Sequence, residues 1–76
     1  MHWQEHITVD SSVLVGKPII RGTRIAVEFI VGLYAAGWTA EQILEDYPHL
    51  SINDLHAALA YAAERLQSEK LYPLSV

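Results

Sequence analysis

Three basic side chains lie close together in the first third of the chain, and their chemistry suits a polyanion. Lys17, Arg21 and Arg24 are three of the five lysines and arginines among 76 residues, and all fall within positions 16–27. Two such stretches side by side in a dimer could place Arg21 and Arg24 in a groove of DNA. The alternative, which we favour, is that both arginines pair with carboxylates of the helical part of the same chain.

The same stretch contains residues that favour turns. Gly16 and Pro18 predict a turn before a strand, and Gly22 permits a bend that residues with a Cβ resist. The short β-prone runs are Ile7–Val9, Val13–Val15, Ile19–Ile20 and Thr23–Ile25, and the last two flank a tight hairpin or an extended corner. Strands of this length need a helix or a second chain to cover them. We expect residues 1–26 to form a β-rich basic arm.

The remainder of the chain predicts helices with defined ends. A first helix runs from about 27 to 36, and Gly37 follows it as a left-handed cap. Thr39 and Gln42 have the spacing of a capping box for a short second helix over 40–46. Both boundaries follow from local residue types.

A third helix begins after Ser51, which forms a weaker capping box with Asp54, and it reaches Gln67 or Ser68. Its apolar residues at helical spacing line one face, made of Leu55, Leu59, Ala62, Ala63 and Leu66. The fold class predicted is mainly α: an arm over 1–26, a trihelical homeodomain-like body over 27–68 and an extended tail over 69–76, in one domain.

The second and third helices with the short break between them form a helix-turn-helix candidate. At the start of the third helix, Asn53 could pair with adenine and Ser51 with a phosphate. Against this reading, no lysine or arginine precedes Arg65 in this helix, and Asp54 would face the DNA backbone unfavourably. Many three-helix bundles have this outline and bind no DNA, so we rank the basic arm above this helix as a nucleic-acid interface.

Composition points to a protein partner. Apolar residues make up 51% of the chain, which is more than a body this small hides easily, so we expect a homo-oligomer. From residue 28 onward the net charge is −5, because seven carboxylates face two basic residues, namely Glu28, Glu41, Glu45, Asp46, Asp54, Glu64 and Glu69 against Arg65 and Lys70. An acidic body repels a phosphate backbone, and a basic protein partner suits it at least as well.

Several other classes of function find no support in the residues. The chain has no cysteine, no signal-peptide pattern and no apolar run of membrane-spanning length, so we expect a cytoplasmic protein. We expect solvated histidines at 2, 6, 49 and 56, because only His2 and His6 have i, i+4 spacing and they lie in a terminus. No catalytic constellation is recognisable. We therefore expect no enzyme activity, no cofactor and no metal.

The chain resembles domain-of-unknown-function family 433 over roughly residues 7–66. The resemblance rests on the run from Gly16 to Ile25, on the stretch from Thr39 to Pro48, and on the residues from Asp54 to Ala62. Ala26 departs from the family, whose members often carry proline there. Membership implies a homeodomain-like fold and a role like that of VapB antitoxins in bacteria and archaea, with a PIN-like ribonuclease toxin as the partner and operator DNA as a further one. The alternative is a stand-alone dimeric helical domain with a structural or regulatory role and no toxin partner.

Overall fold

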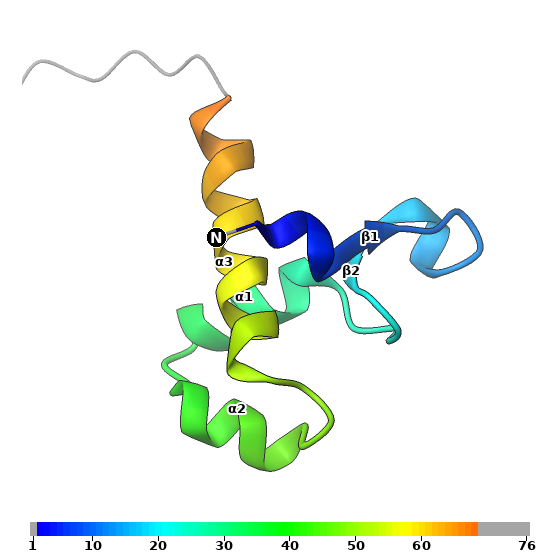
Figure 1. Cartoon of the computed structure of the whole chain (residues 1–76). Helices are drawn as coiled ribbons and strands as arrows, with labels where there is room; N and C mark the ends of the chain where they lie inside the picture. Colours follow the sequence, from blue (N-terminus) through cyan, green and yellow to red (C-terminus); the bar gives the residue numbers. More distant parts are fainter. Residues whose placement is uncertain (1, 69–76) are drawn as a thin grey trace, which may run out of the picture.

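A two-stranded hairpin precedes three helices in the computed structural model, which describes residues 2–68 (Figure 1). In chain order the elements are the 3₁₀ turn η1 (Trp3–Glu5), strand β1 (Ile7–Val9), the 3₁₀ turn η2 (Leu14–Gly16), strand β2 (Pro18–Ile20), and helices α1 (Val27–Ala35), α2 (Ala40–Asp46) and α3 (Ile52–Gln67). The mainly helical fold class predicted from the sequence is confirmed. The predicted tail over 69–76 lies outside the described residues.

The two strands are antiparallel, and Ile7, Thr8 and Val9 pair with Ile20, Ile19 and Pro18 in that order. The prediction of a strand over Val13–Val15 is wrong. Because Val9 pairs with Pro18, the residues between them must reverse the chain direction, and residues 14–16 do so in the left-handed region, with φ values of 50°, 55° and 78°. The pairing of the two strands therefore overrides the local β propensity of these residues.

A second reversal follows β2 and confirms the turn predicted around Gly22. The Thr23 backbone N–H donates to the Ile20 carbonyl at 3.0 Å, and the Ile20 N–H donates to the Ile25 carbonyl at 2.9 Å. Gly22 has φ +81°, the left-handed value that the third position of a type II turn requires. The chain then forms an isolated bridge between Ile19 and Ala26 before α1 begins.

The helix boundaries agree with the sequence prediction to within one residue. Gly37 follows α1 with φ +96°. Both predicted capping boxes form. At the start of α2, the Thr39 side chain accepts the Gln42 backbone N–H, and the Gln42 side chain accepts the Thr39 backbone N–H. At the start of α3, Ser51 and Asp54 form the same two bonds. These bonds satisfy backbone donors that the first turn of a helix otherwise leaves unpaired.

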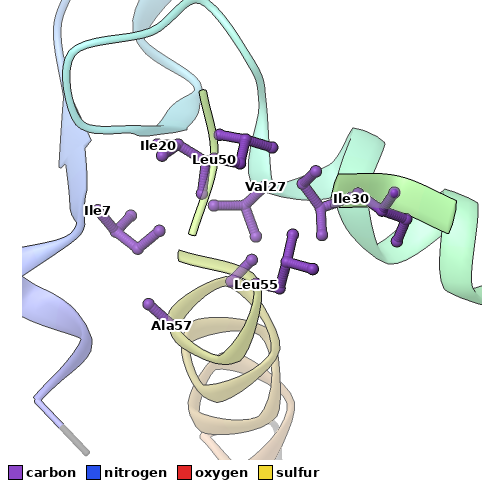
Figure 2. Close-up of a cluster of buried hydrophobic side chains, with 9 residues drawn as sticks. Ile7, Ile20, Val27, Ile30, Leu50, Leu55 and Ala57 are labelled. Atoms are coloured by element: carbon purple, nitrogen blue, oxygen red, sulfur yellow. The ribbon is translucent and has the colours of Figure 1, made fainter. Parts of the chain in front are cut away.

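The core joins the hairpin to the helices (Figure 2). Figure 2 shows Ile7 and Ile20 of the strands pointing toward Val27 and Ile30 of α1 and Leu55 of α3. The full buried cluster is Ile7, Ile20, Val27, Ile30, Ile43, Leu50, Leu55, Ala57 and Ala58. The predicted arm therefore contributes its isoleucines to the same core as the three helices.

Along the apolar face of α3, Leu55 is fully buried and Ala62 is half-buried. The helix buries Ala57 and Ala58 with Leu55, because their small side chains fit where the hairpin and α1 approach. Leu59 and Leu66 instead remain 36% and 61% exposed. Within residues 2–68, no helix combines the length and apolarity that crossing a membrane requires.

Candidate functional site

Arg21, one of the candidate nucleic-acid ligands, is held against the backbone of the N-terminal turn. Its Nη2 donates to the Gln4 carbonyl at 3.0 Å and to the Ile7 carbonyl at 3.4 Å, and its Nε donates to the Glu5 carbonyl at 3.3 Å. These carbonyls lie in and beside η1 and need donors from outside it. The prediction that Arg21 pairs with a carboxylate of the helical body is wrong, because the backbone supplies its acceptors.

Thr23 fixes the turn that presents the two arginines. Its hydroxyl donates to the Ile20 carbonyl at 2.7 Å and accepts the Ile25 N–H at 3.0 Å. Together with the positive φ of Gly22, these bonds explain why a glycine and a threonine stand side by side here. Both serve the local backbone conformation.

The other two basic residues of the stretch differ in what they contact. Lys17 forms an ion pair with Glu28 on α1, which ties the end of η2 to the helical body. Arg24 is exposed, and its side chain makes no hydrogen bond or ion pair with any other part of residues 2–68. Of the three cations, Arg24 is the one whose charge is available to a phosphate without breaking an internal interaction.

The start of α3 holds the remaining candidates, Ser51 and Asn53. The Ser51 hydroxyl accepts the Asp54 N–H at 3.1 Å as a cap of α3, and its own O–H can still donate to a phosphate. Asn53 lies exposed in the first turn. The Oδ2 of Asp54 accepts the Ser51 N–H, as the predicted capping box requires, and its Oδ1 lies 2.9 Å from His6 Nδ1.

The pair of His6 and Asp54 is a contact that sequence reasoning missed. His6 was expected to be solvated, but its side chain is 26% exposed and that of Asp54 is 19% exposed. Partial burial by itself raises the pKa of Asp54, but hydrogen bonds from Ser51 and His6 outweigh it, so that this pKa lies below its ordinary value of 3.8. No sequence signal joins two residues 48 positions apart.

This pair links the two parts of the nucleic-acid candidate. The Arg21 backbone N–H donates to the His6 carbonyl at 2.7 Å, and His6 in turn contacts Asp54, the neighbour of Asn53. The arginine turn and the first turn of α3 are therefore joined through a single residue. Lys17 is instead tied to α1 and lies apart from this connection.

Apolar side chains are exposed at the far end of the hairpin. Val9 is 59% exposed, Leu14 is 41% exposed and Val15 is 96% exposed. Leu14 and Val15 also have positive φ values, which cost a β-branched or bulky residue free energy on the order of 1–3 kcal/mol. We call these three residues the hairpin tip. Strained, exposed apolar residues of this kind are typical of contact sites.

A groove also lies between the hairpin, α1 and the second half of α3. It has a volume of about 390 Å³, and its apolar lining comes from Pro18, Val27, Val31, Tyr61, Ala62 and Leu66. Lys17, Glu28 and Arg65 complete it at the rim. On the other side of Tyr61, the Trp3 ring packs edge-on against the tyrosine at 4.8 Å, and its indole N–H donates to Glu64.

The fold and these surfaces define a class of small, mainly helical domain in which a basic hairpin turn precedes a helix-turn-helix pair. The chain belongs to the DUF433 family, described as proteins of unknown function, whose model matches residues 7–62. The match begins where the resemblance noted from the sequence begins, and it includes the hairpin, all of α1 and α2, and α3 as far as Ala62.

Two similar proteins support this assignment. A crystal structure of a DUF433 member from Anabaena variabilis ATCC 29413 has a TM-score of 0.79 and 33% identity, and the match covers 84% of this chain and 63% of that one. The uncharacterized protein y4eO of Sinorhizobium fredii (strain NBRC 101917 / NGR234) is 36% identical over 59 residues. This stretch is 78% of the present chain but 27% of the Sinorhizobium protein. The chain thus spans about a quarter of that relative.

Proposed function

We propose that this protein is an antitoxin that binds and neutralises a PIN-like ribonuclease and regulates its own operon through DNA. The chain belongs to the DUF433 family, and the role implied by the resemblance noted in the sequence is that of a VapB-like antitoxin. The observation that carries the protein-binding part is the hairpin tip, where Val15 is 96% exposed although its left-handed backbone is strained. A folded domain retains such a residue where an outside contact uses it.

Charge supports the same partner class. A ribonuclease presents cationic surface to its polyanionic substrate. Between residues 28 and 68 this chain carries six carboxylates and the single basic residue Arg65, so its helical body is complementary to such a surface. In this proposal the hairpin tip supplies apolar contact area, and the acidic helices speed and orient the encounter.

The test is co-expression with a PIN-like protein encoded beside this chain, followed by affinity purification. We expect a complex and the rescue of growth that the ribonuclease alone impairs. Val15→Gly should weaken the complex at least tenfold while stability is kept or raised, because glycine adopts φ 55° without strain. Ile52→Ser is the matched control, since Ile52 is a 42% exposed apolar residue outside the hairpin tip.

Two outcomes contradict the protein-binding proposal. One is the absence of any complex with the co-expressed ribonuclease, which would favour a stand-alone helical domain. The other is a complex that Val15→Gly and Ile52→Ser weaken equally, which would remove the hairpin tip as the contact surface.

The proposal for DNA binding rests on Arg24 and on Asn53, which are exposed at two places joined through His6. Binding by the free protein should be weak because of its net charge of −4, and it should strengthen when a toxin partner adds charge or organises two hairpins. Titration of labelled upstream DNA with Arg24→Ala should reduce the slope of log affinity against log salt by about 0.9 for each phosphate that the arginine neutralises in the parent. If Asn53→Ala abolishes binding and Arg24→Ala leaves the slope unchanged, α3 is the reading element and the arginine turn is not.

A further inference from the structure

The second half of α3 carries an apolar stripe that the described chain leaves uncovered. Leu59, Ala62, Ala63 and Leu66 have the i, i+3, i+4, i+7 spacing of one helix face. Leu59 is 36% exposed and Leu66 is 61% exposed, and Figure 1 shows the C-terminal end of α3 extending past the other elements. Such a stripe normally marks the side of a helix that packs against something.

The stripe continues into the groove described above. Ala62 and Leu66 belong to both, so the stripe and the groove floor of Pro18, Val27 and Val31 make one apolar surface. We call this surface the α3 face. It combines a concave part, the groove, with a projecting part, Leu66 at the groove's edge.

Charge identifies what can cover the α3 face. The chain has a net charge of −4, so two copies repel each other over most of their surfaces. Around the α3 face, however, Lys17 and Arg65 balance Glu28 and Glu64. The remaining carboxylates between residues 28 and 68 are Glu41, Glu45, Asp46 and Asp54, and they lie on α2 and at the start of α3. The α3 face is thus both apolar and locally neutral.

We propose that a second copy of this chain covers the α3 face, with the two α3 helices packed antiparallel about a two-fold axis. A two-fold contact uses the same patch on both copies, so the patch must match itself. The α3 face meets this condition, because Leu66 of one copy can enter the groove of the other, and Lys17 beside the groove is already neutralised by Glu28 of its own chain. Ala62 and Ala63 let the helices approach closely. This proposal does not depend on the antitoxin role, whose contact lies at the hairpin tip.

The chain has no cysteine, so a single introduced thiol reports the contact directly. Ala63 is exposed in the middle of the stripe, and Ala63→Cys should give a disulfide-linked dimer under mild oxidation because the Cα atoms of two such residues near the axis lie within about 7 Å. Ile52→Cys is the control on the same helix, about 17 Å from Ala63 along the helix axis. It should stay monomeric under denaturing, non-reducing conditions. Equal cross-linking of the two variants overturns the proposal.

Sedimentation equilibrium of the parent protein gives the second test. We expect a mass of twice the 8.5 kDa chain at micromolar concentration, and we expect Leu66→Glu to weaken the dimer at least tenfold. Ile52→Glu adds the same charge to another exposed apolar position and should leave the dimer intact. A parent that stays monomeric overturns the proposal. If Leu66→Glu also lowers the melting temperature of that monomer more than Ile52→Glu does, residues of the same chain cover the face.

Discussion

The two ends of α3 have different surroundings. The first half begins with a capping box, contacts His6 through Asp54, and buries Leu55, Ala57 and Ala58. Leu59 in the middle of the helix and Leu66 near its C-terminal end are exposed, although they have helical spacing with Leu55. Helical periodicity therefore indicates which face of a helix packs, whereas the positions of the other elements decide whether it packs inside the same chain.

The largest effect is expected from Leu55→Ala. Leu55 is fully buried, so its truncation leaves a cavity and should lower the free energy of unfolding by about 2–5 kcal/mol. Leu66→Ala removes the same atoms from an exposed site and should change the unfolding of the monomer by less than about 0.5 kcal/mol. Urea denaturation at a concentration below dimer formation measures both. Similar losses of unfolding free energy in the two variants would show that Leu55 and Leu66 do not differ in their contribution to the core.

Glycines provide a second contrast, between the hairpin turn and a helix. A Cβ on Gly22 would meet no atom within 4 Å, but the residue has φ +81°, so Gly22→Val should cost more than about 1 kcal/mol through backbone strain alone. Gly32 lies inside α1 with equally open surroundings and ordinary φ, so Gly32→Ala should stabilise the protein by about 0.5–1 kcal/mol. Thermal melts should show a lower melting temperature for Gly22→Val and a higher one for Gly32→Ala than for the parent.

The contact between His6 and Asp54 should contribute less to the free energy of unfolding than the burial of Leu55 does. His6→Ala should cost about 1 kcal/mol, the net value of a partly buried hydrogen bond, whereas the exposed His56 on the same protein should tolerate alanine. Equal melting temperatures for His6→Ala and the parent would show that the contact has no net value.

The stability that Asp54 contributes should depend on pH in one direction. The pKa of Asp54 is lower in the folded protein than its ordinary value of 3.8, so the folded state favours the carboxylate. Its stabilising contribution is therefore complete above pH 3.8 and is lost as the pH falls through the folded pKa. The stability difference between the parent and Asp54→Asn should therefore be larger above pH 3.8 than in stronger acid, where it should shrink. A difference that grows below pH 3.8 would contradict this assignment.

Much of the helical body could be predicted from the sequence, because a capping box or a cap glycine acts within a single turn. Thr39 with Gln42, and Ser51 with Asp54, set the starts of α2 and α3 by contacts three residues apart. The left-handed turn at Leu14 and Val15 could not be predicted, because it opposes the preferences of those residues and arises from the pairing of Val9 with Pro18. The partners of Arg21 and His6 could not be predicted either, since both are distant in sequence.

The smallest stability effect should separate the two arginines of the turn. Arg21→Ala should lower the free energy of unfolding by about 1 kcal/mol, because the carbonyls of Gln4 and Glu5 lose their donor. Arg24→Ala should leave stability within about 0.5 kcal/mol of the parent and should affect DNA binding instead. Melting temperature together with DNA titration checks both. Loss of stability in Arg24→Ala would show that its exposed side chain also supports the fold.

The most direct test of the proposed function is the activity of a purified PIN-like ribonuclease, encoded beside this chain, in the presence of this protein. The account predicts that inhibition is complete at equimolar protein and that Val15→Gly requires at least tenfold more protein for the same inhibition, although it is as stable as the parent. Full ribonuclease activity in a molar excess of the parent protein at micromolar concentration would contradict the account.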